Sequence, residues 1–413
     1  MPAHDKRACF PRLQPAMLEA MNFSHRTAWE TGEDAWASAR RSAGPDLIDL
    51  TIANPTACGL GPPIEEVLRP LAHPGAAFYT PDPLGMLSAR DAVTAYYGDH
   101  HAEVSPEHLC LTTSTSEAYS FLFRLLCDPR DEVLIARPSY PLFDLLAQLD
   151  DVVLKPYPLH CDPGAVPISE SCWNLDMHAL EEAFSPRTRA VVVVHPNNPT
   201  GNYVSAAERV ALRQICARHN VALLVDEVFL DYSLRDARPA SPLARSFISE
   251  ESPGLCFVLS GLSKICALPQ MKLSWIAASG PAELVREAMS RLEIIADTFL
   301  SLNAPVQFAL PHWLAGRHET QSRIRSRSRE NLSILDSMLD GTMASRLPTE
   351  GGWTAVLRVP STVEGEDFAV AAIRRGVLVQ PGVLYDLPTG RCVVSLLTQP
   401  QVMREGLIRL PLT

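Results

Sequence analysis

Short apolar runs alternate with helical patterns through the middle of the chain. Runs rich in Val, Leu and Ile predict strands at 109–113, 132–136, 152–155, 189–194, 221–225, 255–259 and 274–278. Patterns with helical spacing predict helices between them at 116–127, 141–149 and 205–219. The runs near residues 190 and 222 are apolar throughout, as in strands that are buried on both faces. The pattern therefore predicts an α/β domain of three layers, with a mostly parallel sheet covered by helices.

The pattern changes after about residue 280. A long helical stretch, 282–339, is interrupted near Pro305 and Pro311, and its sequence RIRSRSRENL predicts an arginine-rich face in contact with solvent. Residues 345–413 mix strand and helix patterns, which predicts a smaller α+β domain. We expect three parts: an N-terminal segment that packs with the small domain, a large domain, and a small domain with a connecting helix, at 1–50, 51–300 and 301–413.

Composition narrows the class of protein. The 413 residues carry a net charge of −11 and no long Lys/Arg run, which argues against nucleic acid or an anionic membrane as the partner. The ten cysteines form no CxxC pair and no metal site, so we expect free thiols in a reducing compartment. No apolar run approaches the roughly 20 residues that cross a bilayer, and the N-terminus lacks a signal-peptide pattern. These features predict a cytoplasmic protein.

The strongest chemical signal is Lys264, in the segment SGLSKICALPQMK at 260–272. This lysine follows a predicted buried strand and stands among small and apolar residues. Desolvation lowers the pKa of a lysine amine, which is what Schiff-base chemistry requires. Taken alone, a Ser-Lys pair is more often a surface feature, so the other segments matter.

Two of these segments also lie at strand ends. VHPNNPTG spans 194–201, and VDEVF spans 225–229. In an open parallel sheet, ligands bind beyond the carboxyl ends of the strands. There Asp226 can pair with a cationic ring nitrogen, and an asparagine nearby can bind a ring oxygen.

Two upstream segments offer a phosphate site and an aromatic face. TTSTSEAY, 112–119, leads from a strand into a helix, where amides and hydroxyls can hold a phosphate. A plain N-cap with Glu117 explains the same residues. ARPSYPLF, 136–143, puts Tyr140 at a strand end, where its ring can cover a planar ligand or simply pack in the core.

In this order, from about residue 49 to 400, the segments resemble the class I/II aminotransferases of pyridoxal 5′-phosphate (PLP) fold type I, the aspartate-aminotransferase-like enzymes. The resemblance implies that Lys264 holds PLP as a Schiff base and moves the substrate Cα proton. It implies that Asp226 pairs with the pyridine nitrogen, which keeps the ring an electron sink. It also assigns Asn198 to the phenolic oxygen and Tyr140 to the face of the ring.

The same resemblance assigns the periphery of the site. It gives the phosphate to Ser114, Thr115 and Ser263, assisted by Lys272. YTPDPLGML, 79–87, is similar to the segment whose tyrosine reaches the phosphate of the neighbouring subunit, so Tyr79 implies a homodimer. LTIANPT, 50–56, is similar to the segment near the substrate entrance and contains Asn54. EGGW at 350–353 and VQPG at 379–382 match small-domain signatures.

Three positions depart from the family pattern. Lys272 stands where an arginine usually grips the phosphate, and it keeps the charge without the bidentate geometry. Phe229 replaces a tyrosine that donates to the phenolic oxygen, and Tyr232 is expected to face elsewhere. Val393 replaces the arginine that binds the substrate carboxylate. Arg391 lies on the same face of that strand, so it is either a carboxylate ligand or an ordinary surface residue.

The resemblance predicts an aminotransferase of amino-acid metabolism that acts between an α-amino acid and a 2-oxo acid. The alternative is a specialised biosynthetic PLP enzyme catalysing β- or γ-elimination or replacement, cyclisation or oxidation, since Phe229 and Val393 alter the site. A ligand-sensing regulator is disfavoured because no DNA-binding pattern precedes residue 45. A NAD enzyme is disfavoured because no GxGxxG follows a predicted strand.

Overall fold

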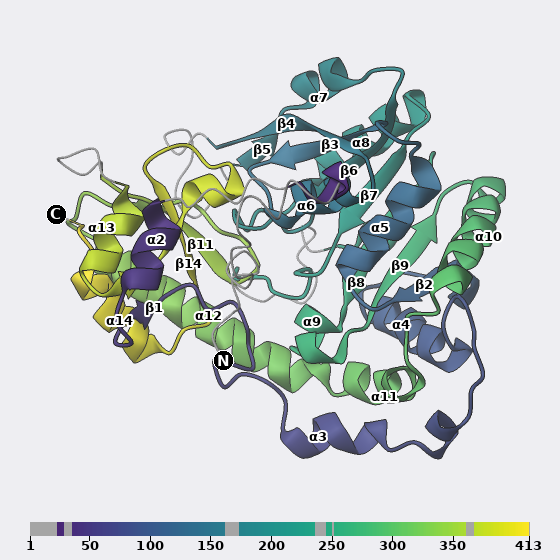
Figure 1. Ribbon diagram of the computed structural model, residues 1–413, viewed down its shortest axis with the longest axis horizontal. Helices are drawn as coiled ribbons and strands as arrows, with labels where there is room; N and C mark the ends of the chain where they lie inside the picture. The colour runs from purple at the N-terminus through teal and green to yellow at the C-terminus, as the bar shows by residue number, and fades with distance from the viewer. Residues whose placement is uncertain are drawn as a thin grey trace.

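A computed structural model of the chain describes residues 23–28, 35–161, 173–235, 245–249, 252–360 and 367–412. Its main element is an eight-stranded sheet in the order β2-β9-β8-β7-β6-β3-β4-β5 (Figure 1). In chain order the strands are β2 (Leu109–Thr112), β3 (Glu132–Arg137), β4 (Val153–Cys161), β5 (Trp173–Leu175), β6 (Thr188–Val194), β7 (Ala222–Asp226), β8 (Cys256–Gly261) and β9 (Ser274–Ser279).

The central strands β8, β7, β6, β3 and β4 pair in parallel. Strand β9 lies antiparallel between β2 and β8, and the short β5 is antiparallel to β4. All seven strands expected from the apolar runs are present, whereas the three-residue β5 was not expected. The prediction of an α/β domain with a mostly parallel sheet is confirmed.

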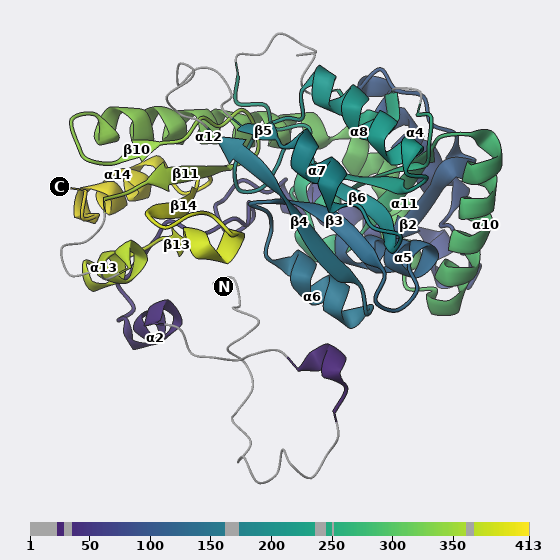
Figure 2. The ribbon, with the colours of Figure 1, turned by 90° about the horizontal axis from the view of Figure 1, so that it is seen from above.

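Helices cover both faces of this sheet (Figure 2). Along β6, Val191 and Val193 face one apolar cluster, while Ala190 and Val192 face the other. Such alternation means that both faces are buried, as the unbroken apolar runs predicted. One cluster includes residues of α4 (Leu87–Asp99), α7 (Met177–Ala183), α8 (Ala206–Arg218) and α11 (Ala304–Ala315), and the other includes residues of α5 (Thr115–Leu126), α6 (Leu142–Leu149) and α10 (Ala282–Phe299).

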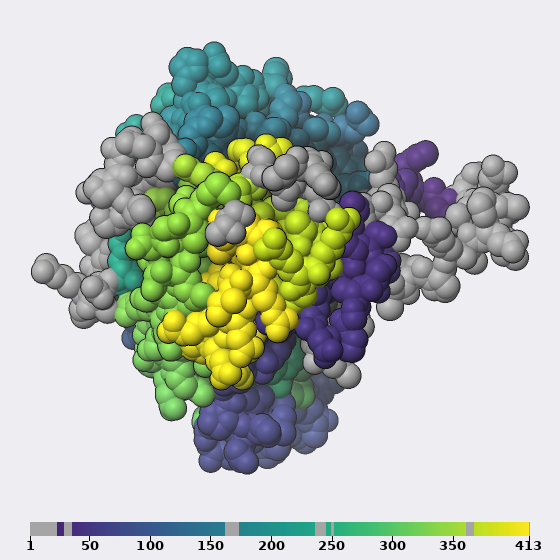
Figure 3. All heavy atoms as spheres, turned by 90° about the vertical axis from the view of Figure 1, so that its left-hand side faces the viewer, coloured from purple at the N-terminus to yellow at the C-terminus, as the bar shows by residue number. Residues whose placement is uncertain are grey.

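The C-terminal part forms a separate, smaller sheet. Its strands follow the order β10-β11-β14-β13, with β10 (Ser345–Arg346), β11 (Thr354–Arg358), β13 (Gln380–Pro381) and β14 (Arg391–Ser395). The helices α13 (Phe368–Arg374) and α14 (Pro400–Arg409) belong to this part. The N-terminal strand β1 (Ile48–Asp49) pairs in parallel with β12 (Val377–Leu378). In Figure 3 the purple helix α2 (Ala35–Ser42) lies beside the yellow-green C-terminal residues.

The connecting region differs from expectation at one proline. Helix α10 ends at Phe299, and α11 begins at Ala304 with Pro305 in its first turn. Pro311 lies inside α11, so the predicted interruption there is wrong. Leu310 and Trp313 flank it and are buried, and this tertiary packing overrides the local preference of proline.

The arginine face of α12 (Arg317–Leu339) also differs from expectation. Arg325 donates to the carbonyl of Asp231 (3.1 Å), and Arg329 donates to the carbonyl of Arg235 (2.8 Å). Arg323 donates to the carbonyl of Gly61 (2.9 Å). These half-buried side chains bind backbone, so the prediction of a face in contact with solvent is wrong. The helix instead ties distant segments of the chain to one another.

Three expectations from composition can be examined in the described residues. Seven cysteines there are free thiols, but Cys161 is disulfide-bonded, so the expectation of free thiols throughout is wrong for that residue. Within the same ranges, no group of three or more His, Cys, Asp or Glu side chains could hold a metal ion. None of the helices described is long and apolar enough to cross a membrane.

Candidate active site

Lys264 and Asp226 lie at the carboxyl ends of neighbouring strands. Strand β7 ends at Asp226, and β8 ends at Gly261, which leads into the four-residue helix α9 (Leu262–Ile265) that carries Lys264. Burial lowers the pKa of Lys264 to about 8, and the Asp226 carboxylate acts in the opposite direction. The site therefore holds an amine that is partly neutral near neutral pH.

Asp226 is a buried carboxylate with weak partners. One oxygen accepts from the amide of Val228 (3.1 Å), and the other accepts from the hydroxyl of Tyr119 (3.3 Å). Burial raises the pKa of Asp226 to about 6, although these hydrogen bonds and Lys264 lower it. A cationic group of a ligand would stabilise the charged form of this carboxylate.

The loop after β6 presents Asn198. Its neighbour Asn197 is fixed, because its amide nitrogen donates to the carbonyl of Pro138 (3.1 Å) and to Oγ1 of Thr200 (2.7 Å). The side-chain Oδ1 of Asn198 is buried and has no hydrogen-bond partner in the described part of the chain. A buried polar atom without a partner is costly, so a ligand that binds this carboxamide would be stabilised.

The register of three strands brings the start of α5 to the same edge of the sheet. Thr112 at the end of β2 and Gly261 at the end of β8 both pair with Ser274 of β9. The half-buried residues Ser114 and Thr115, which follow β2, therefore lie on the side of Lys264 and Ser263. Gly261 is required here, because a Cβ would come within 2.2 Å of the Ser274 hydroxyl.

Ser114 also caps α5. Its hydroxyl accepts from the amide of Glu117 (3.1 Å), while the Glu117 carboxylate accepts from the amide and hydroxyl of Thr113 (2.6 and 2.9 Å). The N-cap alternative is thus present in the structure. This cap uses the amide of Glu117 and leaves the amides of Thr115 and Ser116, in the same turn of α5, to bind an anion. Lys272, in a left-handed conformation (φ 56°), stands exposed two residues before Ser274.

Tyr140 lies beyond the end of β3 and is 44% exposed. Burial, with a smaller effect of the Asp226 carboxylate, raises the pKa of Tyr140. The preceding residue is fixed, because the amide of Ser139 donates to the carbonyl of Tyr385 (3.1 Å). The ring of Tyr140 is therefore placed at the open side of the site.

Aromatic rings surround the Lys264 side chain. Its Nζ lies 5.1 Å from the centroid of Trp353 and 5.5 Å from that of Phe229. The two rings meet edge to face with centroids 4.9 Å apart. Tyr232 donates its hydroxyl to the main-chain carbonyl of Lys264 (2.6 Å). Sequence reasoning missed the roles of Trp353, Tyr232 and Tyr119, although an aromatic residue directly after the Gly-Gly turn was a signal for Trp353.

Arg391 is not brought to this site. It pairs with Arg358 at one end of the β11–β14 ladder, and Ser395 pairs with Thr354 at the other end, next to Trp353. Four residues of strand separate the two ends by about 13 Å, which exceeds the reach of an arginine. Burial, with a smaller effect of Arg358, lowers the pKa of Arg391.

Two other predicted residues make no described contact with Lys264. Tyr79 is 82% exposed. The Oδ1 of Asn54 accepts from the amide and hydroxyl of Thr56 (3.1 and 2.8 Å), so it holds a local turn. This turn still lies near the site, because Ile52 accepts a hydrogen bond from the hydroxyl of Ser395 (2.6 Å).

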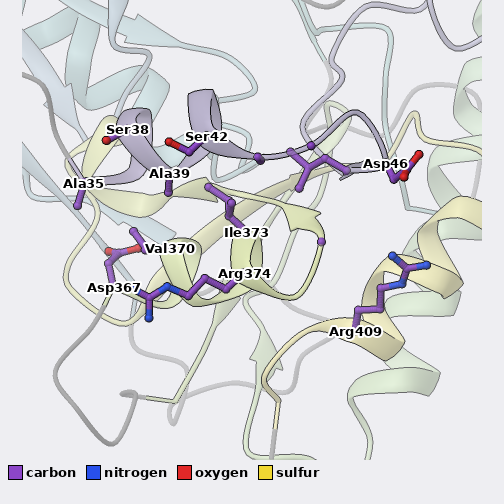
Figure 4. Close-up of a pocket in the computed structure, with 14 residues that line it drawn as sticks. Ala35, Ser38, Ala39, Ser42, Asp46, Asp367, Val370, Ile373, Arg374 and Arg409 are labelled. Carbon is purple, nitrogen blue, oxygen red and sulfur yellow. The ribbon is translucent and has the colours of Figure 1, made fainter.

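A cavity of about 970 Å³ lies elsewhere, between α2, α13 and α14 (Figure 4). Its lining includes Ser38, Asp367 and Arg374, and none of the predicted site residues. Lys264, Asp226 and Asn198 lie instead at the carboxyl edge of the large sheet.

Comparison with known proteins connects this arrangement to a family. Aminotransferase class I and II matches residues 45–407. Alanine aminotransferase of Mycobacterium tuberculosis is 28% identical over 300 residues, which are 70% of this chain and 65% of that protein. Glutamate-pyruvate aminotransferase of Escherichia coli is 29% identical over 279 residues, which are 66% of this chain and 64% of that protein. The chain thus spans slightly less than two thirds of these relatives.

Solved structures show the same fold. Alanine aminotransferase from Pyrococcus furiosus superposes with a TM-score of 0.80 at 21% identity, covering 94% of this chain and 98% of that one. Tyrosine aminotransferase from Leishmania infantum gives 0.77 at 18% identity, covering 92% and 96%. With its family match over most of the sequence, the chain belongs to the aminotransferase class I and II family.

Proposed function

We propose that this protein is a PLP-dependent aminotransferase that moves an amino group between an α-amino acid and a 2-oxo acid. The observation that carries the proposal is the Lys264 amine, with a pKa of about 8, at the strand ends beside the buried carboxylate of Asp226. The relatives named alanine, glutamate-pyruvate and tyrosine aminotransferase support the same reaction.

The residues present fit PLP, the cofactor of this family. The buried carboxylate of Asp226 matches a protonated pyridine nitrogen. The carboxamide of Asn198, whose Oδ1 is buried and unpartnered among the described residues, matches the phenolic oxygen once the amide is turned. The start of α5 matches a phosphate. When bound, PLP supplies an electron sink for a carbanion at the substrate Cα.

In this proposal the protein groups have distinct tasks. Lys264 holds the cofactor covalently and, once released, takes and returns the Cα proton. With a pKa of about 8, roughly a quarter of this amine is neutral at pH 7.5, so it acts as a base without further activation. Tyr140 covers one face of the ring. Asp226 holds the ring nitrogen in its protonated form.

The phosphate and the substrate use the rim of the site. We assign the phosphate to Ser114, Thr115 and Ser263, with Lys272 as the nearby charge. Asn54 lies in the segment at the substrate entrance. Arg391 is left out of the proposed site, because the strand register keeps it away from Lys264.

We further propose a homodimer in which Tyr79 reaches the site of the partner. The support is a group of exposed apolar side chains in one stretch of sequence: Ile64, Leu68, Phe78, Tyr79 and Leu87 are between 54% and 82% exposed. An exposed apolar surface of this kind is typical of an interface. We also propose a division into a segment 1–50, a large domain 51–300 and a small domain 301–413. A cytoplasmic location is proposed as well: the seven free thiols favour a reducing compartment, whereas the disulfide at Cys161 is unusual for one.

The test is a two-step amino transfer followed by absorbance. Purified protein with PLP is mixed with L-alanine, L-glutamate or L-tyrosine, and the matching or another 2-oxo acid is added afterwards. The proposal predicts that one amino acid removes the absorbance band of the lysine-bound cofactor and that the oxo acid restores it. Lys264→Ala should do neither. Release of ammonia with no need for an oxo acid would contradict transamination.

A further inference from the structure

Tyr232 is hydrogen-bonded to the main chain of Lys264. The tyrosine is fully buried, and its hydroxyl donates to the Lys264 carbonyl over 2.6 Å. The same carbonyl accepts from the amide of Ala267 (3.2 Å), which closes the turn after α9. Because α9 has only four residues, it offers little internal support, and this bond from outside fixes the point from which the Lys264 side chain extends.

Tyr232 is itself held at its other end. Its own carbonyl accepts from the amide of Gly352 (2.9 Å), and Ser233 forms an antiparallel bridge with Gly351. The segment after β7 is therefore joined to the turn that precedes β11 of the small domain. Tyr232 therefore connects the carbonyl of Lys264 to that turn.

Trp353, in the same turn, contacts both the ring of Tyr232 and the amine of Lys264. Its ring packs against Tyr232 with centroids 5.0 Å apart, and the Nζ of Lys264 lies 5.1 Å from it. The amide of Leu396 donates to the Trp353 carbonyl (2.8 Å), which fixes the tryptophan on the small sheet. Lys264 is thus held at its carbonyl by Tyr232 and at its amine by an aromatic face.

We propose that Tyr232 is a positioning residue for Lys264, which couples the reacting amine to the Gly351–Trp353 turn of the small domain. This inference rests on the proposed function of Lys264. The hydroxyl of Tyr232 is the critical group, because a phenylalanine would fill the same space and keep the contact with Trp353. Its effect on the reaction is exerted through Lys264.

The chain contains a closely matched control. Tyr157 on β4 is also buried and donates its hydroxyl to a main-chain carbonyl, that of Val192 (3.1 Å). Tyr157→Phe removes the same kind of bond at a place that contacts neither Lys264 nor the Gly351–Trp353 turn. Tyr232→Phe and Tyr157→Phe are therefore compared with wild type, after thermal unfolding has shown that each is folded.

Two readouts are measured. The first is amino transfer by the PLP-loaded protein from L-alanine or L-glutamate. The second is the reactivity of Lys264 in the cofactor-free protein, followed by reductive methylation and mass spectrometry between pH 6 and 11. For Tyr232→Phe we expect kcat to fall roughly three- to tenfold with KM within about twofold, as for one hydrogen bond to a group that acts in the transition state. We also expect the midpoint of Lys264 methylation to move to higher pH, because a less fixed amine is better hydrated.

The outcomes separate the inference from the proposed function. If wild type shows no absorbance of lysine-bound cofactor, the proposed function fails, and the methylation of Lys264 still decides the positioning role. The inference stands only if Tyr232→Phe changes Lys264 reactivity and Tyr157→Phe does not; equal behaviour of the two variants overturns it. If Tyr232→Phe does not fold, Arg329→Ala, which removes two hydrogen bonds to the segment that carries Tyr232, is measured against the same control and by the same criterion.

Discussion

Asp226 and Lys264 are ionisable side chains whose pKa values move toward one another. Burial raises the pKa of Asp226 to about 6 and lowers that of Lys264 to about 8. In both cases desolvation disfavours the charged form, and mutual attraction offsets only part of this cost. Burying these two ionisable groups lowers the stability of the fold but gives them pKa values suited to proton transfer near neutral pH, as is common at functional sites.

The cost of burying the Asp226 charge can be measured as a difference in the free energy of unfolding. A carboxyl group with a raised pKa stabilises the fold below its unfolded value near 3.8 and loses that contribution as pH rises through about 6. Asp226→Asn removes the cost of the charge, so we expect the cofactor-free variant to gain about 1 to 3 kcal/mol at pH 8 and less at pH 5. Urea unfolding of both proteins at the two pH values measures this. A variant that is less stable than wild type at pH 8 would contradict the account.

At the level of elements, strand register decides which side chains reach the site. Arg391 and Ser395 lie on one strand, yet the Arg358 and Thr354 pairings place them at opposite ends of the ladder. We therefore expect Arg391→Ala to leave the KM for the best amino-acid donor within about twofold of wild type. A tenfold rise in KM, measured by steady-state kinetics, would show that Arg391 binds the substrate after all.

Helix α12 gives a second prediction at this level. Arg329 donates to the carbonyls of Ser233 and Arg235 (3.3 and 2.8 Å), on the segment that carries Tyr232. Arg329→Ala should lower the free energy of unfolding by about 1.5 to 3 kcal/mol, since two hydrogen bonds from a charged donor to half-buried carbonyls are lost. The control is Arg286→Ala, whose exposed pair with Glu283 should matter by less than about 0.5 kcal/mol. Equal losses of unfolding free energy in the two variants would mean that the arginine face of α12 is in contact with solvent, as the sequence predicted.

Sequence patterns predicted the elements of the large sheet better than their arrangement. Apolar runs such as VVVV at 191–194 indicate strands, because strands buried on both faces need apolar residues at every position. The antiparallel insertion of β9 between β2 and β8 leaves no such signal, since the direction of pairing depends on long-range topology. Packing by Leu310 and Trp313 likewise kept α11 intact across Pro311.

The site was predictable where it depends on local sequence and unpredictable where it depends on tertiary contact. Asp226 is the last residue of a strand, and Asn198 and Lys264 closely follow strands, so their place at the sheet edge could be inferred. Tyr232 could not be assigned, because its bond to the Lys264 carbonyl joins two segments that pattern alone does not bring together. The distance of Arg391 from the site also required the register.

At the scale of the whole molecule, the proposed dimer predicts a defined assembly. Phe78 is 70% exposed and lies next to Tyr79 in the group of exposed apolar residues between 64 and 87. We expect wild type to sediment as a dimer at micromolar concentration and Phe78→Glu to sediment as a monomer with reduced activity. The control is Ile408→Glu on α14, which is 73% exposed and should leave the dimer intact. A monomeric wild type would remove Tyr79 from the site.

The central claim, that Lys264 carries the cofactor, has a direct test within one peptide region. Purified protein is incubated with PLP, reduced with borohydride to make the linkage permanent, digested and examined by mass spectrometry. Lys264 and Lys272 lie close in sequence, and Lys272 is exposed, so it reports non-specific modification. The account predicts stoichiometric labelling of Lys264, little of Lys272, and none at position 264 in Lys264→Ala. Labelling of Lys272 in preference to Lys264, or of neither, would contradict it.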